Sequence, residues 1–170
     1  MPKLSAGIML YRLNLGRVEV LLVHPGGPFW AKKDAGAWSI PKGEYTKDED
    51  AFAAAKREYA EELGSQTPDG AYIELGDVRY SNKHLLAWAV QGDMDTKTVT
   101  SNSFELEWPP KSGQKQSFPE VDKAAWFDGA TAKHKLVPGQ VPLLLTLLQQ
   151  LAAAESDSTE QQPPKQLPLL

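Results

Sequence analysis

Apolar and polar positions alternate along much of the chain in a way that predicts two β-hairpins and further short strands. Bulky apolar residues before and after Asn14-Leu15-Gly16 predict the first hairpin, and Ser81-Asn82-Lys83 separates the two halves of the second. The predicted strands span residues 4–14, 18–23, 72–80, 84–91, 104–108 and 124–127, with a short extended piece at 37–40. Residues 111–117 are rich in Gly, Lys and Gln and predict a flexible loop.

Two stretches have helical character instead. Alanine-rich sequence between Thr46 and Gly64 predicts a helix, with Thr46 and Glu49 as a capping box and Gly64 as the C-terminal stop. Its apolar stripe is Phe52, Ala55 (or the stem of Lys56), Tyr59 and Leu63. A leucine-rich segment at 140–154 predicts a second helix, and 129–133 a short helical piece. Strands on both sides of one helix, with another helix at the end, predict an α/β fold in which a mixed sheet lies between two helical layers.

Composition limits the classes of protein that fit. The chain has 170 residues, 41% hydrophobic and 24% charged, which suits one globular domain at residues 1–154. From residue 155 to 170 the sequence turns to Ser, Asp, Gln and Pro and predicts a disordered tail. A net charge of −4 argues against a nucleic-acid-coating protein, so a nucleic acid partner is not expected. The absence of cysteine excludes disulfides and thiolate metal sites and fits a cytoplasmic protein, and no segment predicts membrane contact.

The predicted helix carries a cluster of carboxylates. Glu58, Glu61 and Glu62 fall at i, i+3 and i+4 and therefore lie on one side of the helix. Like charges this close repel unless a positive group joins them. Arg57 relieves part of the repulsion and a divalent cation relieves more, with Mg²⁺ favoured for oxygen ligands and Mn²⁺ as a substitute. The alternative is a solvated acidic helix face, and Glu49 has an ordinary explanation as a capping residue.

The spacing of these residues resembles the Nudix box of hydrolases that cleave nucleoside diphosphates linked to another group. The matching positions are Gly43, Glu49, Arg57, Glu58, Glu61, Glu62 and Gly64. Tyr59 and Ser65 stand where the family has aliphatic residues, which concerns packing more than chemistry. The resemblance implies a Nudix-like α/β/α sandwich over residues 3–153. It also implies that the Gly43 carbonyl binds metal with the box carboxylates, while Glu49 and Arg57 order the helix.

Residues outside the box supply further candidates. Trp38-Ser-Ile-Pro41-Lys42 leads into the box, as in family members acting on dinucleoside polyphosphates or diphosphoinositol polyphosphates. Trp38 and Lys42 are therefore candidates for substrate contact, and the ammonium group of Lys42 can lie beside a polyphosphate. The alternative is a core Trp38 and a solvent-facing Lys42. Glu120 lies six residues before Trp126, where several Nudix enzymes have a metal ligand or base; it can equally be an exposed loop carboxylate. Asp122 is the second choice for that role.

Aromatic and basic side chains near the box are candidates for substrate contact. Trp30 is the first choice for stacking on a nucleobase, before Phe29, Trp108 and Tyr80. Among basic residues, Lys32, Lys33 and Lys83 can receive phosphates, although each can also be an ordinary surface lysine. The histidines at strand ends, His24 and His84, are interpreted as structural.

The carboxylate cluster, together with the resemblance to the Nudix family, predicts a Mg²⁺-dependent pyrophosphohydrolase. Glu58, Glu61 and Glu62 are its expected catalytic and metal-binding residues, and Glu120 or a box glutamate takes the proton. A nucleoside triphosphate or dinucleoside polyphosphate is the expected substrate. ADP-ribose or a nucleotide sugar is the alternative within the same reaction, and a non-catalytic nucleotide-binding module is the alternative from another class. Whether the chain forms a homodimer stays open.

Overall fold

A mixed β-sheet forms the centre of the protein, in a computed structural model that describes residues 2–161. Its strands are β1 (Lys3–Asn14), β2 (Arg17–Pro25), β3 (Lys42–Glu44), β4 (Ile73–Tyr80), β5 (Lys83–Gln91) and β8 (Val121–Asp128). The strand order is β4-β5-β1-β2-β8, and β3 pairs with one end of β1. Strands β1 and β5 are parallel, whereas the other pairs are antiparallel. Both predicted hairpins are therefore present.

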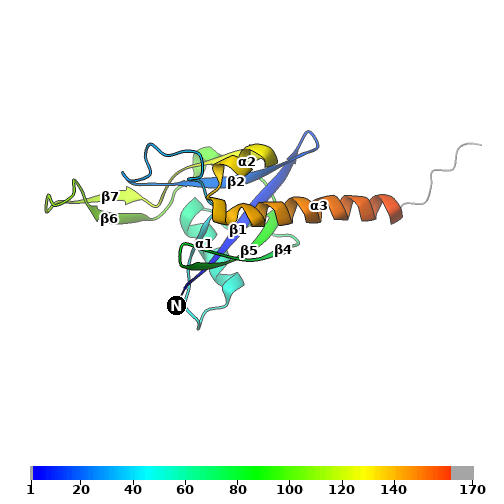
Figure 1. Ribbon diagram of the computed structural model, residues 1–170, viewed down its shortest axis with the longest axis horizontal. Coiled ribbons are helices and arrows are strands. Elements are labelled where there is room, and N and C mark those ends of the chain that lie inside the picture. The colour runs from blue at the N-terminus through cyan, green and yellow to red at the C-terminus, as the bar shows by residue number, and fades with distance from the viewer. Residues whose placement is uncertain (1, 162–170) are drawn as a thin grey trace, which may run out of the picture.

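Helices cover both faces of this sheet (Figure 1). Helix α1 (Ala51–Leu63) packs on β1 and β3, while α2 (Gly129–Lys135) packs on β2 and α3 (Val141–Gln161) on β4. Successive side chains of β1 point to opposite faces of the sheet. Ile8 and Leu10 therefore join the core under α1, and Met9 and Tyr11 join the core under α3. The predicted α/β/α sandwich with a mixed sheet is confirmed. Two 3₁₀ turns, η1 (Thr96–Thr98) and η2 (Pro138–Gln140), complete the elements.

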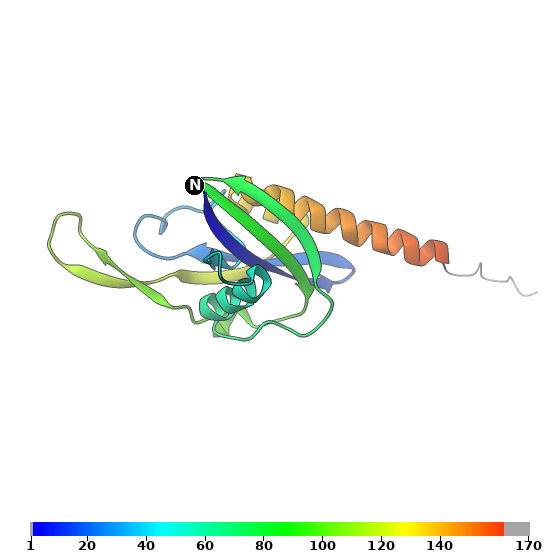
Figure 2. The ribbon, with the colours of Figure 1, turned by 90° about the horizontal axis from the view of Figure 1, so that it is seen from below.

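A two-stranded arm extends from this body (Figures 1 and 2). It consists of β6 (Ser103–Glu107) and β7 (Lys115–Pro119), which form a separate two-stranded sheet. The prediction of a flexible loop at 111–117 is wrong for its last three residues, because Lys115 begins β7. The strand escaped detection because nearly all of its side chains are exposed. It consequently lacks the apolar alternation from which strands are predicted.

The boundaries of two helices also differ from the prediction. Helix α1 begins after Asp50, whose carboxylate accepts a hydrogen bond from the Ala53 N–H at 3.0 Å, so the predicted cap at Thr46 is wrong. Thr46 instead closes a turn, since its carbonyl accepts from the Glu49 N–H. Gly64 ends the helix as predicted, with a left-handed φ of 78°. Helix α3 runs to Gln161 rather than to residue 154, and the rest of the predicted tail, 162–170, lies outside the described residues.

No helix within residues 2–161 combines the length and the apolar character needed to cross a bilayer.

Candidate active site

The box begins on β3, and this short strand brings it against helix α1. Gly43 pairs with Ala6 of β1, and β3 contacts α1 directly. A Cβ atom on Gly43 would lie only 2.0 Å from the carboxylate of Glu58, so only glycine leaves room for that carboxylate. Glu58 is itself buried, which is unusual for a glutamate and requires polar partners.

Arg57 is the main partner of the box carboxylates. Its guanidinium donates to Glu58 at 2.9 Å, to Glu61 at 3.3 Å and to Glu49 at 3.1 and 3.2 Å. Glu49 therefore anchors the arginine and does not cap the helix, which corrects the capping-box interpretation. Arg57 is shared among three carboxylates, so it offsets only part of their negative charge.

Burial, and then the charge of neighbouring carboxylates, raises the pKa of three carboxyl groups in this cluster. Burial raises the pKa of Glu62 to about 8, although Lys42 opposes this shift and its backbone N–H donates to Glu62 at 3.2 Å. Burial, followed by the charge of Glu61, raises the pKa of Glu58. The pKa of Glu120 rises for the same two reasons. The structure thus brings Glu120, from a distant part of the chain, into the electrostatic field of the box.

This group of oxygens has the chemistry of a site for a hard divalent cation. Gly43, Glu58, Glu61, Glu62 and Glu120 offer only oxygen donors, and the missing Cβ of Gly43 leaves space beside them. Among the side chains of residues 2–155, no three acidic or histidine groups already converge as a set of metal ligands. Arg57 holds Glu58 and Glu61 in ion pairs. The donor types fit Mg²⁺.

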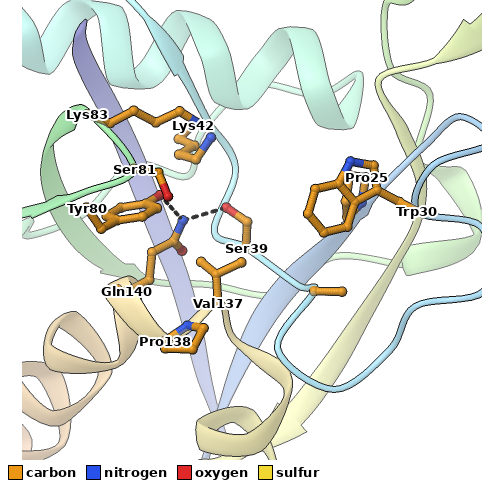
Figure 3. A pocket seen from close by; sticks show the side chains of 12 residues that line it. Pro25, Trp30, Ser39, Lys42, Tyr80, Ser81, Lys83, Val137, Pro138 and Gln140 are labelled. Atoms are coloured by element: carbon orange, nitrogen blue, oxygen red, sulfur yellow. Dashed lines mark hydrogen bonds between the residues drawn. The ribbon is translucent and has the colours of Figure 1, made fainter. Parts of the chain in front are cut away.

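Two hollows meet at Lys42. The smaller, of about 210 Å³, is lined by Lys42, Glu62 and Glu120 among others. The larger, of about 670 Å³, extends from Lys42 to Trp30 (Figure 3). Pro25 and Ser39 line both hollows, so Lys42 lies between the carboxylates and the larger cavity.

A buried glutamine shapes the larger cavity. Gln140 is fully buried, and its side-chain oxygen accepts from the Ile40 N–H at 3.0 Å. Its side-chain nitrogen donates to Ser39 at 2.8 Å and to the Tyr80 hydroxyl at 2.7 Å (Figure 3). It thereby joins the segment entering the box to strand β4. Sequence reasoning missed Gln140, because a single polar residue before a leucine-rich helix carries no local signal of its distant partners.

The predicted substrate residues Trp30, Lys32 and Trp38 lie in different surroundings. Trp30, 36% exposed, lines the large cavity, and the Lys33 ammonium lies 4.9 Å from its ring centre. Lys32 is exposed and lies outside the lining of the cavities described above. Trp38 is 4% exposed and packs edge-on against Phe127 at 4.9 Å. Its predicted substrate contact is therefore unsupported, and its place in the core agrees with the alternative interpretation.

Asp122, the second choice beside Glu120, has a different partner. Its carboxylate lies 2.9 Å from Nδ1 of buried His24, whose Nε2 lies 2.6 Å from the carbonyl oxygen of Lys33. Both ring nitrogens thus face acceptors, and the histidine ties the loop that carries Trp30 to β8. This agrees with the structural interpretation of His24. Trp108 belongs to the arm and packs against Phe29 at 5.5 Å.

The fold and the box together define a class of protein. In this class an α/β/α sandwich places a carboxylate-rich helix beside a short strand that contains a glycine. The family model of the NUDIX domain matches residues 1–147, and the chain belongs to this family. A search of curated protein sequences found no match. The enzyme class that the family supports is a pyrophosphohydrolase.

Solved structures have the same fold. A Caenorhabditis elegans Ap4A hydrolase binary complex is 20% identical with a TM-score of 0.58, covering 89% of this chain and 98% of that one. The NUDIX domain of Shewanella oneidensis NrtR complexed with ADP ribose is 17% identical with a TM-score of 0.60, covering 89% of both chains. A MutT protein from Methanosarcina mazei Go1 is 16% identical with a TM-score of 0.56, covering 88% and 94%. At these identities the likeness shows the fold alone.

Proposed function

We propose that this chain is a Mg²⁺-dependent pyrophosphohydrolase that cleaves a nucleoside diphosphate linked to another moiety. The preferred substrate is a nucleoside triphosphate or a dinucleoside polyphosphate. The observation that carries the proposal is that Lys42, Glu62 and Glu120 line one hollow. Glu58 and Glu61 lie near enough to interact electrostatically with these carboxylates. Carboxylates and a lysine at one hollow suit a ligand that brings both phosphates and a cation.

Each residue has a separate task in this proposal. Glu58, Glu61, Glu62 and Glu120 hold Mg²⁺, or Mn²⁺ in its place, together with the Gly43 carbonyl. The ion, when bound, neutralises the diphosphate and stabilises charge that develops during displacement at phosphorus. Lys42 donates to a phosphate oxygen. Glu120 or a glutamate of the box accepts the proton of the attacking water. Glu49 holds the Arg57 guanidinium, which also donates to Glu58 and Glu61, and so positions these carboxylates without contacting the substrate.

Glu61→Gln and Glu62→Gln test these roles. Each change keeps the shape of the side chain but removes a carboxyl group that would bind the cation, so Mg²⁺-dependent turnover should be lost while the thermal unfolding curve stays cooperative. Glu74→Gln, on the exposed side of β4, is the matched control and should retain activity. Normal turnover in both box variants would contradict the proposal.

A second candidate is hydrolysis of ADP-ribose or a nucleotide sugar by the same residues. It is favoured by the likeness to the NrtR domain, whose structure holds ADP ribose. A non-catalytic nucleotide-binding module is opposed by the complete set of box carboxylates. Chromatography of products from nucleoside triphosphates, dinucleoside polyphosphates and ADP-ribose distinguishes the three. Homodimer formation and a cytoplasmic location stay predictions, and light scattering of purified protein tests the first.

A further inference from the structure

The large cavity contains a pair of lysines that the metal site does not use. Lys42 and Lys83 approach each other at one end of the cavity, with Trp30 on the opposite side (Figure 3). Twelve residues line the cavity, all within the described part of the chain, and none of them is acidic. Neither lysine forms an ion pair with any side chain that the structure describes. Two ammonium groups therefore lie at one end of the cavity without an acidic residue in its lining.

The pair costs stability when nothing is bound. The two ammonium groups are close enough for their positive charges to repel each other. Glu62 attracts Lys42 but lines the smaller hollow with Glu120 and does not line the large cavity. Like charges held together in a partly buried position are relieved by an anion that contacts both. This favours an anionic ligand group between the two ammonium groups.

The backbone fixes Lys83 in this position. The hairpin between β4 and β5 turns through Ser81 and Asn82, whose φ angles of 47° and 56° are both left-handed. Two left-handed residues are typical of a tight type I′ turn, which sets the register of the strands that follow. Tyr80 and Lys83 pair directly across the turn, and the Tyr80 hydroxyl is bonded to Gln140. The Lys83 Cα therefore belongs to a well-defined hairpin rather than to a mobile loop tip.

We propose that Lys42 and Lys83 together bind a phosphate group beyond the bond that is cleaved, so that Lys83 selects substrates with three or more consecutive phosphates. This inference rests on the proposed function and deepens it. The diphosphate to be cleaved lies with the carboxylates, Lys42 lies at the junction of the two hollows, and Lys83 lies one step further. A substrate whose diphosphate is followed by a ribose would leave the charge of Lys83 unpaired. A tri- or tetraphosphate chain would neutralise it.

Binding of inorganic tripolyphosphate, measured by calorimetry without divalent cations, tests the site independently of catalysis. Lys83→Met keeps most of the apolar stem and removes the charge, and affinity should fall about 10- to 100-fold because one charge-assisted hydrogen bond is lost. Lys83→Arg should bind nearly as tightly as the wild type. Lys133→Met, on the exposed side of α2, is the control and should leave affinity unchanged. Equal affinity in the wild type and Lys83→Met would overturn the inference.

Turnover gives the second readout and separates this inference from the proposed function. With Mg²⁺, the ratio of kcat/KM for a dinucleoside tetraphosphate to that for ADP-ribose should fall at least about tenfold in Lys83→Met. An unchanged ratio in an active enzyme would overturn the role of Lys83 and leave the hydrolase function intact. Lys83-dependent tripolyphosphate binding in a protein that cleaves no substrate would support the anion site and contradict the hydrolase function.

Discussion

Gly43→Ala changes the geometry of the site by a single methyl group. The added Cβ would lie 2.0 Å from the Glu58 carboxylate, whereas ordinary contact begins at 3.4 Å, so the carboxylate must move by about 1.4 Å (3.4 − 2.0). Displacing a reacting group by about 1 Å can cost about 10²-fold in rate. We therefore expect kcat/KM to fall by about 100-fold or more. The Gly43 carbonyl remains in the variant, so the loss reports on the position of Glu58.

Folding should be affected much less than turnover. The clash involves the end of a flexible side chain, and Gly43 is not among the glycines with a left-handed φ. The free energy of unfolding should change by less than about 2 kcal/mol in a urea titration, the usual range for a single substitution. Gly129→Ala is the matched control, since its Cβ would meet only Leu148 at 3.2 Å and should leave turnover unaltered. Full Mg²⁺-dependent activity in Gly43→Ala would refute this reasoning.

Three further predictions concern residues that stabilise the fold around the site. Asp50→Ala should lower the free energy of unfolding by about 1 kcal/mol and Thr46→Ala by much less, because Asp50 is the cap of α1; equal losses in urea titrations would contradict this assignment. Gln140→Leu should cost about 1–3 kcal/mol in the same assay by leaving buried polar groups unpaired, and an unchanged midpoint would count against that role. The hydrogen bond from Lys135 lowers the pKa of Asp34 below its ordinary value of 3.8. Ionised Asp34 therefore stabilises the folded state above pH 3.8, and this stabilisation is lost as the pH falls through the lowered pKa. The Tm difference between wild type and Asp34→Asn should therefore close on acidification, and a difference that widens would contradict the sign.

The parts of the structure that depend on neighbouring residues could be predicted from the sequence. Helix α1 and the common side of Glu58, Glu61 and Glu62 follow from helical periodicity, which requires no knowledge of the rest of the fold. The cap was misassigned because Thr46 and Asp50 both precede the helix and both are good capping residues. Only the backbone geometry decides between them.

The parts that depend on distant residues could not be predicted. The approach of Lys83 to Lys42 requires the parallel pairing of β1 with β5 and the pairing of β3 with β1, neither of which leaves a local mark in the sequence. The same holds for Gln140, which reaches Ser39 from 101 residues away. The arm was only half predicted, because β7 is exposed on both faces and its strand pairing is not accompanied by burial.

Cleavage of nucleotides by the purified chain tests the central claim most directly. The full chain with Mg²⁺ is incubated separately with a dinucleoside tetraphosphate, a nucleoside triphosphate and ADP-ribose, and the products are identified by chromatography. The proposed function predicts cleavage within the phosphate chain that stops when the cation is chelated, with the polyphosphates cleaved more efficiently than ADP-ribose. A folded protein that cleaves none of these compounds with Mg²⁺ or Mn²⁺ would contradict it.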